Sequence, residues 1–524
     1  MNTSTDPALF EAASRANETG MATAVWAAAF PQKTAIYEAD GGRTRSFGDL
    51  NANANRIGRR LRKAGLKAGD AVALLCTNRI EFAEVMLGVL RVGMRLTPVN
   101  WHLTADEIAY IVNDCEAQAL FADIRVEGAL DAAIQCPMLS LKVIVGGELA
   151  GFTTYSDALA ELDGSNIADA SRGHTMLYTS GTTGRPKGVY KPNAPVLPLD
   201  SSYDHEVDVH LCTGPGYHSA PLYADIRKPL SNGVPTVLLD KWNTEQVLAL
   251  IEQHRVTRSH FVPIMFQRLL ALPQAVRGRA DTSSLQRVIH GAAPCPPEVK
   301  RAMIEWLGPV LNEYYAGSEG GVGFSVNSED WLRKPGTVGR SPDPGATKIL
   351  DEEGRETAVG ASGLIYMRLA DQGVFEYFKD GTKTTSSQRD GYFTIGDIGY
   401  LDDDGYLFLT GRSAETIIAG GVNIYPQEID NQLIKHPAVE DSCTVGVPHE
   451  DWGEEVRAVV QLKAGFEPSP ALRNELLAFA ADHVAKFKVP RALDFAASLP
   501  RSAAGKIQRN MVREPYWIGK TRKI

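Results

Sequence analysis

The chain has 524 residues, of which 44% are hydrophobic and 22% are charged, and its formal net charge is −9. This length exceeds what one hydrophobic core holds and favours about three domains or subdomains. The acidic balance argues against wholesale binding to nucleic-acid phosphates, and six scattered cysteines without a CxxC pair indicate neither a zinc site nor a disulfide framework.

Residues 1–174 alternate between helix and strand patterns. Ser46 is placed to cap a helix that stops at Gly65, and Thr104 with Glu107 forms a capping-box pattern before another helix. An amphipathic helix is expected over 81–92, and buried strands over 72–75, 120–122 and 143–145. Strands that alternate with helices predict a mostly parallel sheet covered by helices, which serves as scaffold and one wall of a pocket.

The stretch 178–189 reads YTSGTTGRPKGV and follows a short apolar run. Its ten residues 179–188 hold three glycines and four hydroxyl side chains, together with Lys187. Glycines let the backbone approach a ligand, and free N–H groups, hydroxyls and a lysine can all bind a phosphate. No Gly-Lys-Ser/Thr closes the stretch, so it is not a P-loop. Clusters of such residues are usually surface loops. Composition alone therefore does not distinguish a surface loop from a phosphate-binding loop, and the order of the residues has to do so.

Residues 208–316 repeat the alternation, with strands expected over 211–213, 237–239, 261–262, 288–290 and 311–315. The first strand leads into a Gly-Pro-Gly-Tyr run before His218, the fourth leads into Gly291-Ala292-Ala293, and the fifth ends before Ala316-Gly317-Ser318-Glu319. Small residues after a buried strand let a flat ring approach the backbone, and Pro296 and Pro297 open the next helix. A carboxylate at such a strand end suits Mg²⁺, which takes few protein oxygens.

After about residue 335 the pattern changes to short strands and Gly-rich turns, which predicts a small β subdomain. It contains the segment DGYFTIGD over 390–397 and the pair Gly411-Arg412. The last hundred or so residues predict a compact α+β unit with helices over 427–434 and 471–487. That unit includes GGVNIYP from Gly420 and LPRSAAGKIQR, in which Lys506 follows a glycine.

These motifs, in this order, resemble those of the adenylate-forming superfamily, most closely its acyl-CoA synthetase branch, and the resemblance covers nearly the whole chain. The resemblance implies an α/β and α+β multidomain fold: a large N-terminal domain of two α/β lobes plus a β subdomain, then a small mobile C-terminal α+β lid. We expect an AMP-binding domain over 1–411, a hinge over 412–416 and the lid over 417–524. The family's charged hinge residue is Ala414 here, so the hinge position depends on the resemblance alone.

The resemblance also implies roles for individual residues. The triphosphate of ATP would bind Thr179, Ser180, Gly181, Thr182, Thr183, Gly184 and Lys187. Adenine would stack on Gly291, Ala292 and Ala293, Asp397 would accept the ribose hydroxyls and Arg412 would hold the nucleotide from the other side. The other cofactor-binding residues implied are Tyr315, Ala316 and Ser318. Gly420 and Gly421 would lie beside the pantetheine of CoA. Ser318 replaces the family's threonine and keeps its hydroxyl.

The catalytic residues implied are Lys506, Glu319 as the Mg²⁺ ligand, Thr182 and His218. His218 would line the acyl pocket, although a hydrogen-bonded structural histidine explains it equally well. ATP would react with a carboxylic acid to give an acyl-adenylate and pyrophosphate, and the thiol of CoA would then release AMP.

A medium- or long-chain fatty acid is the first choice of substrate, with aryl and steroid-side-chain acids close behind. A carrier-protein thiol could replace CoA as the acyl acceptor. A luciferase-like oxygenase and a non-catalytic nucleotide-binding protein are more remote alternatives for the function. With no transmembrane segment and no signal-peptide pattern, we expect a cytoplasmic enzyme with no nucleic-acid partner and at most a peripheral membrane contact. Oligomeric state is left open, a homodimer included.

Overall fold

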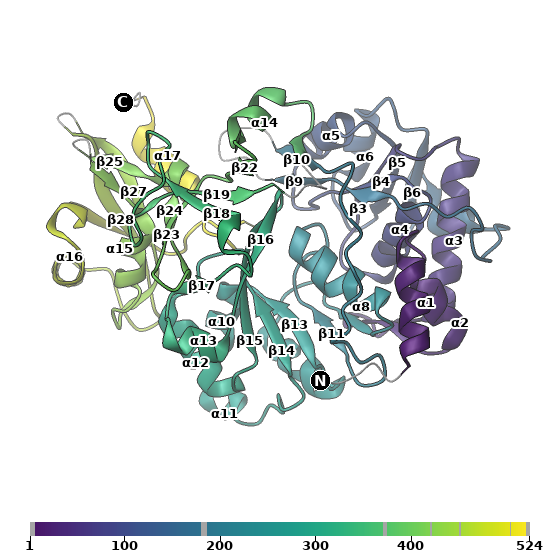
Figure 1. Cartoon of the computed structure of the whole chain (residues 1–524), viewed down its shortest axis with the longest axis horizontal. Helices are drawn as coiled ribbons and strands as arrows, with labels where there is room; N and C mark the ends of the chain where they lie inside the picture. Colours follow the sequence, from purple (N-terminus) through teal and green to yellow (C-terminus); the bar gives the residue numbers. More distant parts are fainter. Residues whose placement is uncertain are drawn as a thin grey trace. The chain divides into compact units, whose positions relative to one another are not determined.

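A computed structural model of the chain describes residues 6–179, 186–369, 375–419, 422–449, 452–502 and 505–519. Contacts between residues divide the chain into two compact units (Figure 1). Unit 1 consists of Met1–Phe261, Leu272–Ile289 and Leu369–Ser386, and unit 2 of Val262–Ala271, His290–Arg368 and Ser387–Ile524. Among the described residues, no helix has the length and apolar character needed to cross a membrane.

Unit 1 contains a six-stranded parallel sheet, which confirms the expectation for the N-terminal part. Its order is β7 (Thr153–Thr154), β6 (Leu141–Val145), β5 (Ala117–Asp123), β3 (Ala71–Leu75), β4 (Arg95–Pro98) and β8 (His174–Thr175). The helices α4 (Ile80–Leu90), α5 (Ala105–Asp114) and α6 (Ala129–Ile134) lie between consecutive strands of this sheet, and α7 (Tyr155–Leu159) follows β7. Connections between parallel strands usually contain such a helix, which explains the alternating sequence pattern.

Both faces of this sheet are covered by hydrophobic cores, as the side chains of β3 show. Val72 and Leu74 belong to one hydrophobic core, whereas Ala73 and Leu75 belong to another. Because successive side chains of a strand point to opposite faces, a strand between two cores must be apolar throughout. The uninterrupted apolar sequence of this strand therefore predicts its position correctly.

Six strands of a second, eight-stranded sheet follow one another in the order β14 (Arg287–His290), β13 (Arg258–Phe261), β11 (His210–Cys212), β12 (Thr236–Leu238), β1 (Thr34–Glu38) and β2 (Thr44–Ser46). A separate small sheet joins β9 (Leu177–Thr179), β10 (Lys187–Tyr190) and β20 (Glu376–Tyr377). The other helical segments are α1 (Pro7–Asn17), α2 (Ala22–Ala29), α3 (Phe47–Lys63), the π-helix η1 (Pro221–Arg227), α8 (Lys228–Ser231), α9 (Thr244–Gln253), α11 (Gln274–Arg277) and α14 (Gly381–Ser387).

Helix α4 corrects one expectation, because it is buried on all sides and not amphipathic. It lies beside α3 (Figure 1). Its two glutamates suggested an outer face, but both are buried in ion pairs: Glu81 with Arg43 at 2.8 Å and Glu84 with Arg45 at 2.9 Å. Buried carboxylates persist when paired, so polar residues in a periodic pattern do not always mark solvent.

Unit 2 contains the hairpin β15 (Leu311–Gly317) and β16 (Gly320–Asn327), together with α10 (Pro263–Leu270), α12 (Pro297–Leu307) and α13 (Ser328–Arg333). The small β subdomain follows as predicted. Its sheet joins β17 (Thr337–Gly339), β24 (Leu407–Arg412), β23 (Asp397–Leu401), β19 (Gly363–Arg368), β22 (Tyr392–Phe393) and β21 (Gln388–Arg389), with β18 (Thr347–Leu350) paired to β19.

The C-terminal part of unit 2 is an α+β fold, also as predicted. Its sheet joins β26 (Val422–Ile424), β25 (Ile417–Ala419), β28 (Gly453–Leu462) and β27 (Val439–His449), with β29 (Ala492–Ala496) beside β28. Its helices are α15 (Pro426–Leu433), α16 (Pro470–His483) and α17 (Arg509–Trp517). The prediction that one helix extends to residue 487 is wrong: α16 ends at His483, because the backbone of Val484 is extended, with φ −127° and ψ 158°, and cannot continue the helix.

Candidate active site

The two ends of the Gly/Thr-rich stretch lie on the paired strands β9 and β10 of unit 1. Thr179 and Lys187 are direct register partners across this antiparallel pair. Five predicted phosphate-binding residues between them lie outside the described residues, namely Ser180, Gly181, Thr182, Thr183 and Gly184. The Lys187 ammonium forms an ion pair with Asp380, which holds the pKa of that carboxyl below its usual value. A phosphate that bound Lys187 would have to share it with this carboxylate.

Asp397 is the centre of a hydrogen-bonded group in unit 2. The hydroxyl of Tyr315 donates to Asp397 Oδ2 at 2.8 Å, and Arg412 Nε lies 3.0 Å from Oδ1. The second contact follows from strand register, because Asp397 begins β23 directly opposite Arg412 at the end of β24. Burial, with the nearby carboxylate, raises the pKa of Tyr315 well above its usual value, so the phenol remains a donor at neutral pH.

The turn between β15 and β16 carries Ser318 and Glu319. Strand β15 runs to Gly317, past Ala316 and two residues further than the sequence predicts. A Cβ built on Gly317 would lie 2.9 Å from Glu319 Oε2 and 3.0 Å from Ile395, so the Glu319 carboxylate lies against the glycine backbone. Among the described residues, no group of three or more His, Cys, Asp or Glu side chains could hold a metal. One carboxylate is nevertheless enough for an Mg²⁺ that is held mainly by phosphate oxygens and water.

The predicted adenine loop follows β14 and is strained. Ala292 has a φ of +66°, a left-handed conformation that non-glycine residues rarely adopt. A Cβ at Gly291 would lie 2.7 Å from the carbonyl oxygen of Tyr314, so the loop packs directly against β15. Ala292 itself is exposed, and the neighbouring Ala293 is half-buried. Strained backbone of this kind persists where the surroundings impose it, often at functional sites.

Lys506 lies on a short turn near the C-terminus. The N–H of Ser502 donates to the Lys506 carbonyl at 2.8 Å, and Arg501 Nη1 donates to the Gly505 carbonyl at 2.9 Å. Gly505 has a φ of +78°, and a Cβ there would come within 2.4 Å of Ile264. The glycine before the lysine is therefore required by conformation and by space.

The charge of Lys506 depends on the groups that the fold brings near it. Although the residue as a whole is exposed, desolvation by surrounding protein lowers the pKa of its ammonium to about 8. Arg412 repels it further, while Asp397, Glu415 and Glu319 attract it and oppose the shift. The structure thus brings the predicted ribose, metal and catalytic residues of unit 2 into one electrostatic environment.

His218 lies in unit 1, where the Gly-Pro-Gly-Tyr run meets the π-helix η1. Its ring lies 4.6 Å from that of Tyr217, which in turn packs edge-on against Trp101 at 4.5 Å. The His218 ring is thus part of an aromatic cluster. π-Helical turns occur frequently at functional sites. Both the acyl-pocket role and the structural role remain predictions at this position.

The remaining predicted residues, Gly420 and Gly421, lie outside the described residues. Two partners were not found from the sequence. Asp380 pairs with Lys187 across 193 residues, and Glu415 acts on Lys506 across 91. An acidic residue in a loop gives no sequence signal for a partner so distant along the chain.

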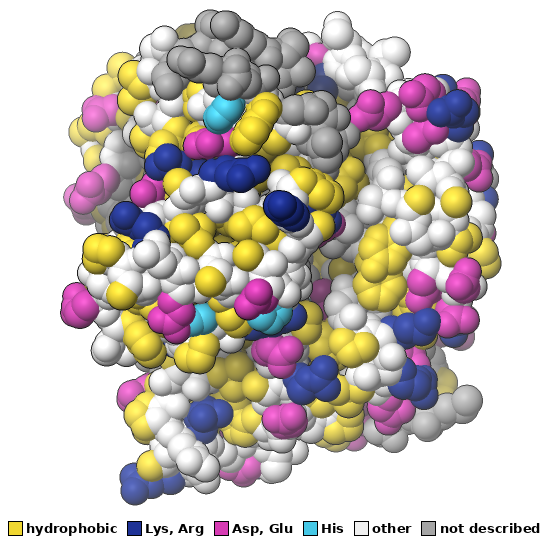
Figure 2. Space-filling model, turned by 90° about the vertical axis from the view of Figure 1, so that its left-hand side faces the viewer, with side chains coloured by type: hydrophobic (Ala, Val, Ile, Leu, Met, Phe, Trp, Pro, Cys, Tyr) yellow, Lys and Arg dark blue, Asp and Glu magenta, His cyan; other side chains and the backbone are white. Residues whose placement is uncertain are grey.

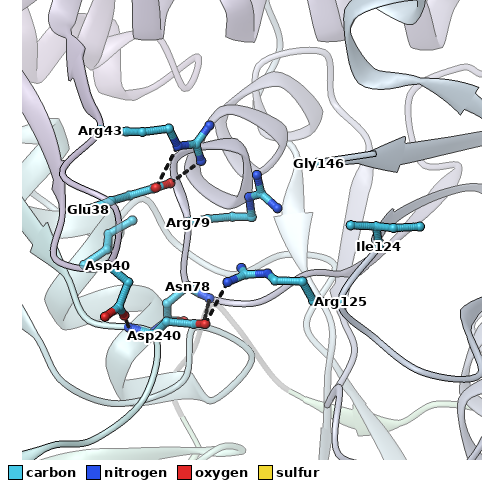
Figure 3. A pocket seen from close by; sticks show the side chains of 10 residues that line it. Glu38, Asp40, Arg43, Asn78, Arg79, Ile124, Arg125, Gly146 and Asp240 are labelled. Atoms are coloured by element: carbon cyan, nitrogen blue, oxygen red, sulfur yellow. Dashed lines mark hydrogen bonds and ion pairs between the residues drawn. The ribbon is translucent and has the colours of Figure 1, made fainter. Parts of the chain in front are cut away.

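A polar cavity of about 270 Å³ lies elsewhere in unit 1, and none of its ten lining residues is a predicted site residue (Figure 3). Arg43 lies between β1 and β2, Arg79 follows β3 and Arg125 follows β5; Figure 3 shows Arg43 paired with Glu38 and Arg125 with Asp240. Each is already paired: for example, Arg79 lies 2.7 Å from Glu81 and Arg125 lies 2.9 Å from Asp240. We therefore interpret this cavity as an ion-pair network that joins strand ends.

One face of the molecule mixes both signs of charge with hydrophobic side chains (Figure 2). Lysines and arginines on this face are interspersed with aspartates and glutamates. Binding along a nucleic acid requires a basic stripe or patch that is not interrupted in this way. In this view, the described residues form no uninterrupted basic patch.

Comparisons with known proteins place the chain in a family. The AMP-binding enzyme model matches residues 23–376, and the model of the AMP-binding enzyme C-terminal domain matches residues 428–506. The fatty acid–[acyl-carrier-protein] ligase ScoC of Streptomyces coeruleorubidus is 30% identical over 92% of this chain and 94% of its own. The 2-succinylbenzoate–CoA ligase of Geobacillus kaustophilus is 33% identical over 92% and 95%.

A solved structure, ATP-bound MatB from Rhodopseudomonas palustris, has a TM-score of 0.78 and 29% identity and covers 94% of this chain and 98% of its own. The large N-terminal and small C-terminal parts of the predicted fold are thereby confirmed. The chain belongs to the AMP-binding enzyme family, in the acyl-CoA synthetase branch of the adenylate-forming superfamily, and is an enzyme of the acid–thiol ligase class.

Proposed function

We propose that the protein is an ATP-dependent, AMP-forming acyl-CoA ligase. It activates a hydrophobic carboxylic acid, with a medium- or long-chain fatty acid as first choice, and transfers the acyl group to CoA. The observation that carries the proposal is the group in unit 2 in which Asp397 accepts from Tyr315 and Arg412 while Lys506 is held near the same carboxylate.

This geometry supports a nucleotide site. A carboxylate has about four lone-pair positions, and the contacts with Tyr315 and Arg412 occupy only two, so Asp397 can still accept from two ribose hydroxyls. Arg412, which is partly exposed, can reach toward a bound nucleotide while it orients Asp397. The stacking position for adenine would be the loop 291–293, where small side chains leave the backbone open to a flat ring.

The chemical problem is charge. A carboxylate that attacks the α-phosphate of ATP forms a mixed anhydride and releases pyrophosphate, and negative charge develops on the phosphates as it does so. Lys506 would supply a positive charge at that phosphate, and the hydroxyls and N–H groups of 179–188 would hold the β- and γ-phosphates. A magnesium ion bound through Glu319 would neutralise part of the phosphate charge. The CoA thiol then attacks the acyl carbon, and AMP leaves with the electrons of the broken bond.

The two half-reactions support a proposed division into an N-terminal domain (1–411), a hinge (412–416) and a lid (417–524). Lys506 serves the first step, and the Gly420-Gly421 loop serves the second beside pantetheine. One site that must present different groups in turn needs a moving part. In the structure, the proposed hinge contains a short 3-10 turn, Ser413–Glu415.

The acceptor and the acid define the main alternatives. The relatives named above act on a fatty acid with an acyl-carrier protein in one case and on 2-succinylbenzoate with CoA in the other. An aryl or steroid-side-chain acid, or a carrier-protein thiol, is therefore the second candidate. A cytoplasmic location and the choice between monomer and homodimer stay predictions.

The test is an ATP–pyrophosphate exchange screen over fatty, aryl and steroid-side-chain acids, followed by product analysis with CoA and with a carrier protein. We expect exchange that depends on the acid and a thioester that forms with CoA. Exchange without any thioester on CoA would favour the carrier-protein alternative. The absence of exchange with every acid would contradict the proposed function.

A further inference from the structure

A buried ion pair in unit 2 is not explained by the proposed chemistry. Lys300 Nζ on α12 lies 2.6 Å from Glu313 Oε2 on β15. Lys300 has no solvent exposure, Glu313 retains 5%, and the ammonium lies 4.7 Å from the ring centroid of Trp331. Taking both charges out of water is costly, and such pairs are often no more stabilising than an apolar pair of similar size. The pair therefore calls for a role beyond stability.

The pair connects the two ends of the loop that precedes α12. Lys300 lies in the first turn or so of that helix, just after residues 291–296. His290, the last residue before the loop, is fully buried, and its Nε2 lies 3.8 Å from the same Glu313 Oε2. The His290 ring is fixed by an edge-on contact with Phe266 at 5.2 Å. One carboxylate oxygen thus contacts the residue before the loop and the helix after it.

The same strand also places Tyr315. Side chains at i and i+2 share a face of a strand, and Glu313 and Tyr315 are both buried on one face of β15. Tyr315 reaches Asp397 from that position. Glu313 therefore lies where a shift of α12 against β15 would change the distance between the loop 291–293 and the Tyr315–Asp397 contact.

The backbone of the loop needs such a restraint. A left-handed backbone conformation is unfavourable for any residue other than glycine, and Ala292 is held in that conformation at φ +66°. Strain of this kind persists only where the surrounding structure fixes it. Contacts at both ends of the loop, made by one carboxylate, are a physical means of fixing it.

We propose that Glu313, held in place by Lys300, is a positioning residue for the nucleotide base: it clamps both ends of the loop 291–296 and so keeps Ala292 and Ala293 in the conformation that receives adenine. The inference rests on the proposed function only in assigning adenine to this loop. Neither side chain touches the reacting atoms.

The deciding variant is the apolar pair Lys300→Met/Glu313→Leu, because it removes the charges without leaving one of them buried alone. Its matched control is Arg301→Met, a partly exposed position next along the same helix. Thermal unfolding reports stability. Calorimetric titration with ATP and with GTP, in the absence of acid, reports the affinity and base preference of wild type and variants.

We expect the double variant to unfold at or above the wild-type temperature, yet to bind ATP about tenfold more weakly and to lose most of its preference for ATP over GTP. Arg301→Met should match wild type in both measurements. Wild-type ATP affinity and base preference in a stable double variant would overturn the proposal and leave the pair a structural one.

Two further outcomes are also informative. If the double variant is unfolded by circular dichroism, the comparison moves to Glu313→Gln, which keeps the volume, and unchanged ATP-over-GTP preference there overturns the proposal. If wild type binds ATP but shows no pyrophosphate exchange with any acid, the proposed function fails while the clamp is still tested by binding. Wild-type binding of ATP no tighter than GTP would reject the assignment of adenine to the loop.

Discussion

Lys506 shows how a single side chain can link the fold to a measurable pH dependence. Its pKa is lowered to about 8, first by desolvation and then by repulsion from Arg412. The protonated form carries the charge that the phosphates need. Because a lowered pKa means that the ammonium loses its proton sooner as pH rises, activity should be retained below about pH 8 and lost above it.

We expect kcat/KM for ATP in the adenylation step to fall about tenfold per pH unit above pH 8, since this parameter reports the free enzyme. Pyrophosphate exchange between about pH 6 and pH 10 measures it. The control is Lys506→Arg, because the guanidinium stays charged over this whole pH range. The remaining activity of this variant should not fall above pH 8. The same fall in kcat/KM above pH 8 in that variant would assign the titration to another group.

His218 is the residue whose acyl-pocket role can be separated from a structural one. If the ring lines the pocket, His218→Ala enlarges it and should change the ratio of kcat/KM between short and long acids severalfold, as a change of one or two methylenes does elsewhere. Exchange assays over an acid series measure the ratio. A uniform loss across the series, together with a lower unfolding temperature, would identify a structural histidine.

At the scale of elements, the contact between β15 and β23 joins the hairpin of unit 2 to its β subdomain. Tyr315→Phe removes one hydrogen bond to a buried carboxylate and little volume. Such bonds contribute about 1.5–3 kcal/mol, so Asp397 should be held less firmly and KM for ATP should rise by about tenfold or more, with KM for the acid unchanged.

Tyr400→Phe is the matched control, because Tyr400 lies on the same strand β23 and stacks on Phe408 at 5.0 Å. It should leave both KM values as in wild type. Steady-state kinetics of both variants decide the matter. Equal increases in the two KM values of Tyr315→Phe would show that the contact supports the fold of unit 2 and not the nucleotide in particular.

At the scale of the whole molecule, the proposed lid predicts that the two half-reactions can be separated. Lys506→Ala should reduce acyl-adenylate formation by about a hundredfold or more, the usual effect of losing one well-placed charge donor. It should still convert supplied acyl-adenylate and CoA to thioester. Gly421→Leu, which would obstruct pantetheine according to the family resemblance, should do the reverse.

Each half-reaction is assayed alone in both variants, with pyrophosphate exchange for the first and thioester formation from synthetic acyl-adenylate for the second. A lid that rotates between steps requires the two variants to fail at different steps. An equal loss of both steps in Lys506→Ala would show that this lysine does not act in one conformation only.

Local physics explains why so much of the fold could be predicted. The apolar run of β3, the capping box at Thr104 and the helix cap at Ser46 each depend on neighbours within a few residues, and the structure has them as expected. The expectations that proved wrong are the outer face of α4 and the length of α16. Both depend on which residues pack against the helix, and the hydrophobic periodicity of the helix sequence carries no information about these neighbours.

The sequence by itself determined the family, the order of the motifs and the residues within them, because these are properties of short segments. Only the tertiary structure decided that Asp397 faces Arg412 across β23 and β24, that Tyr315 reaches the same carboxylate, and that Lys187 is paired with Asp380. These contacts join residues between 15 and 193 positions apart. Strand register and the burial of charge fix them, and both arise only when distant segments pack together.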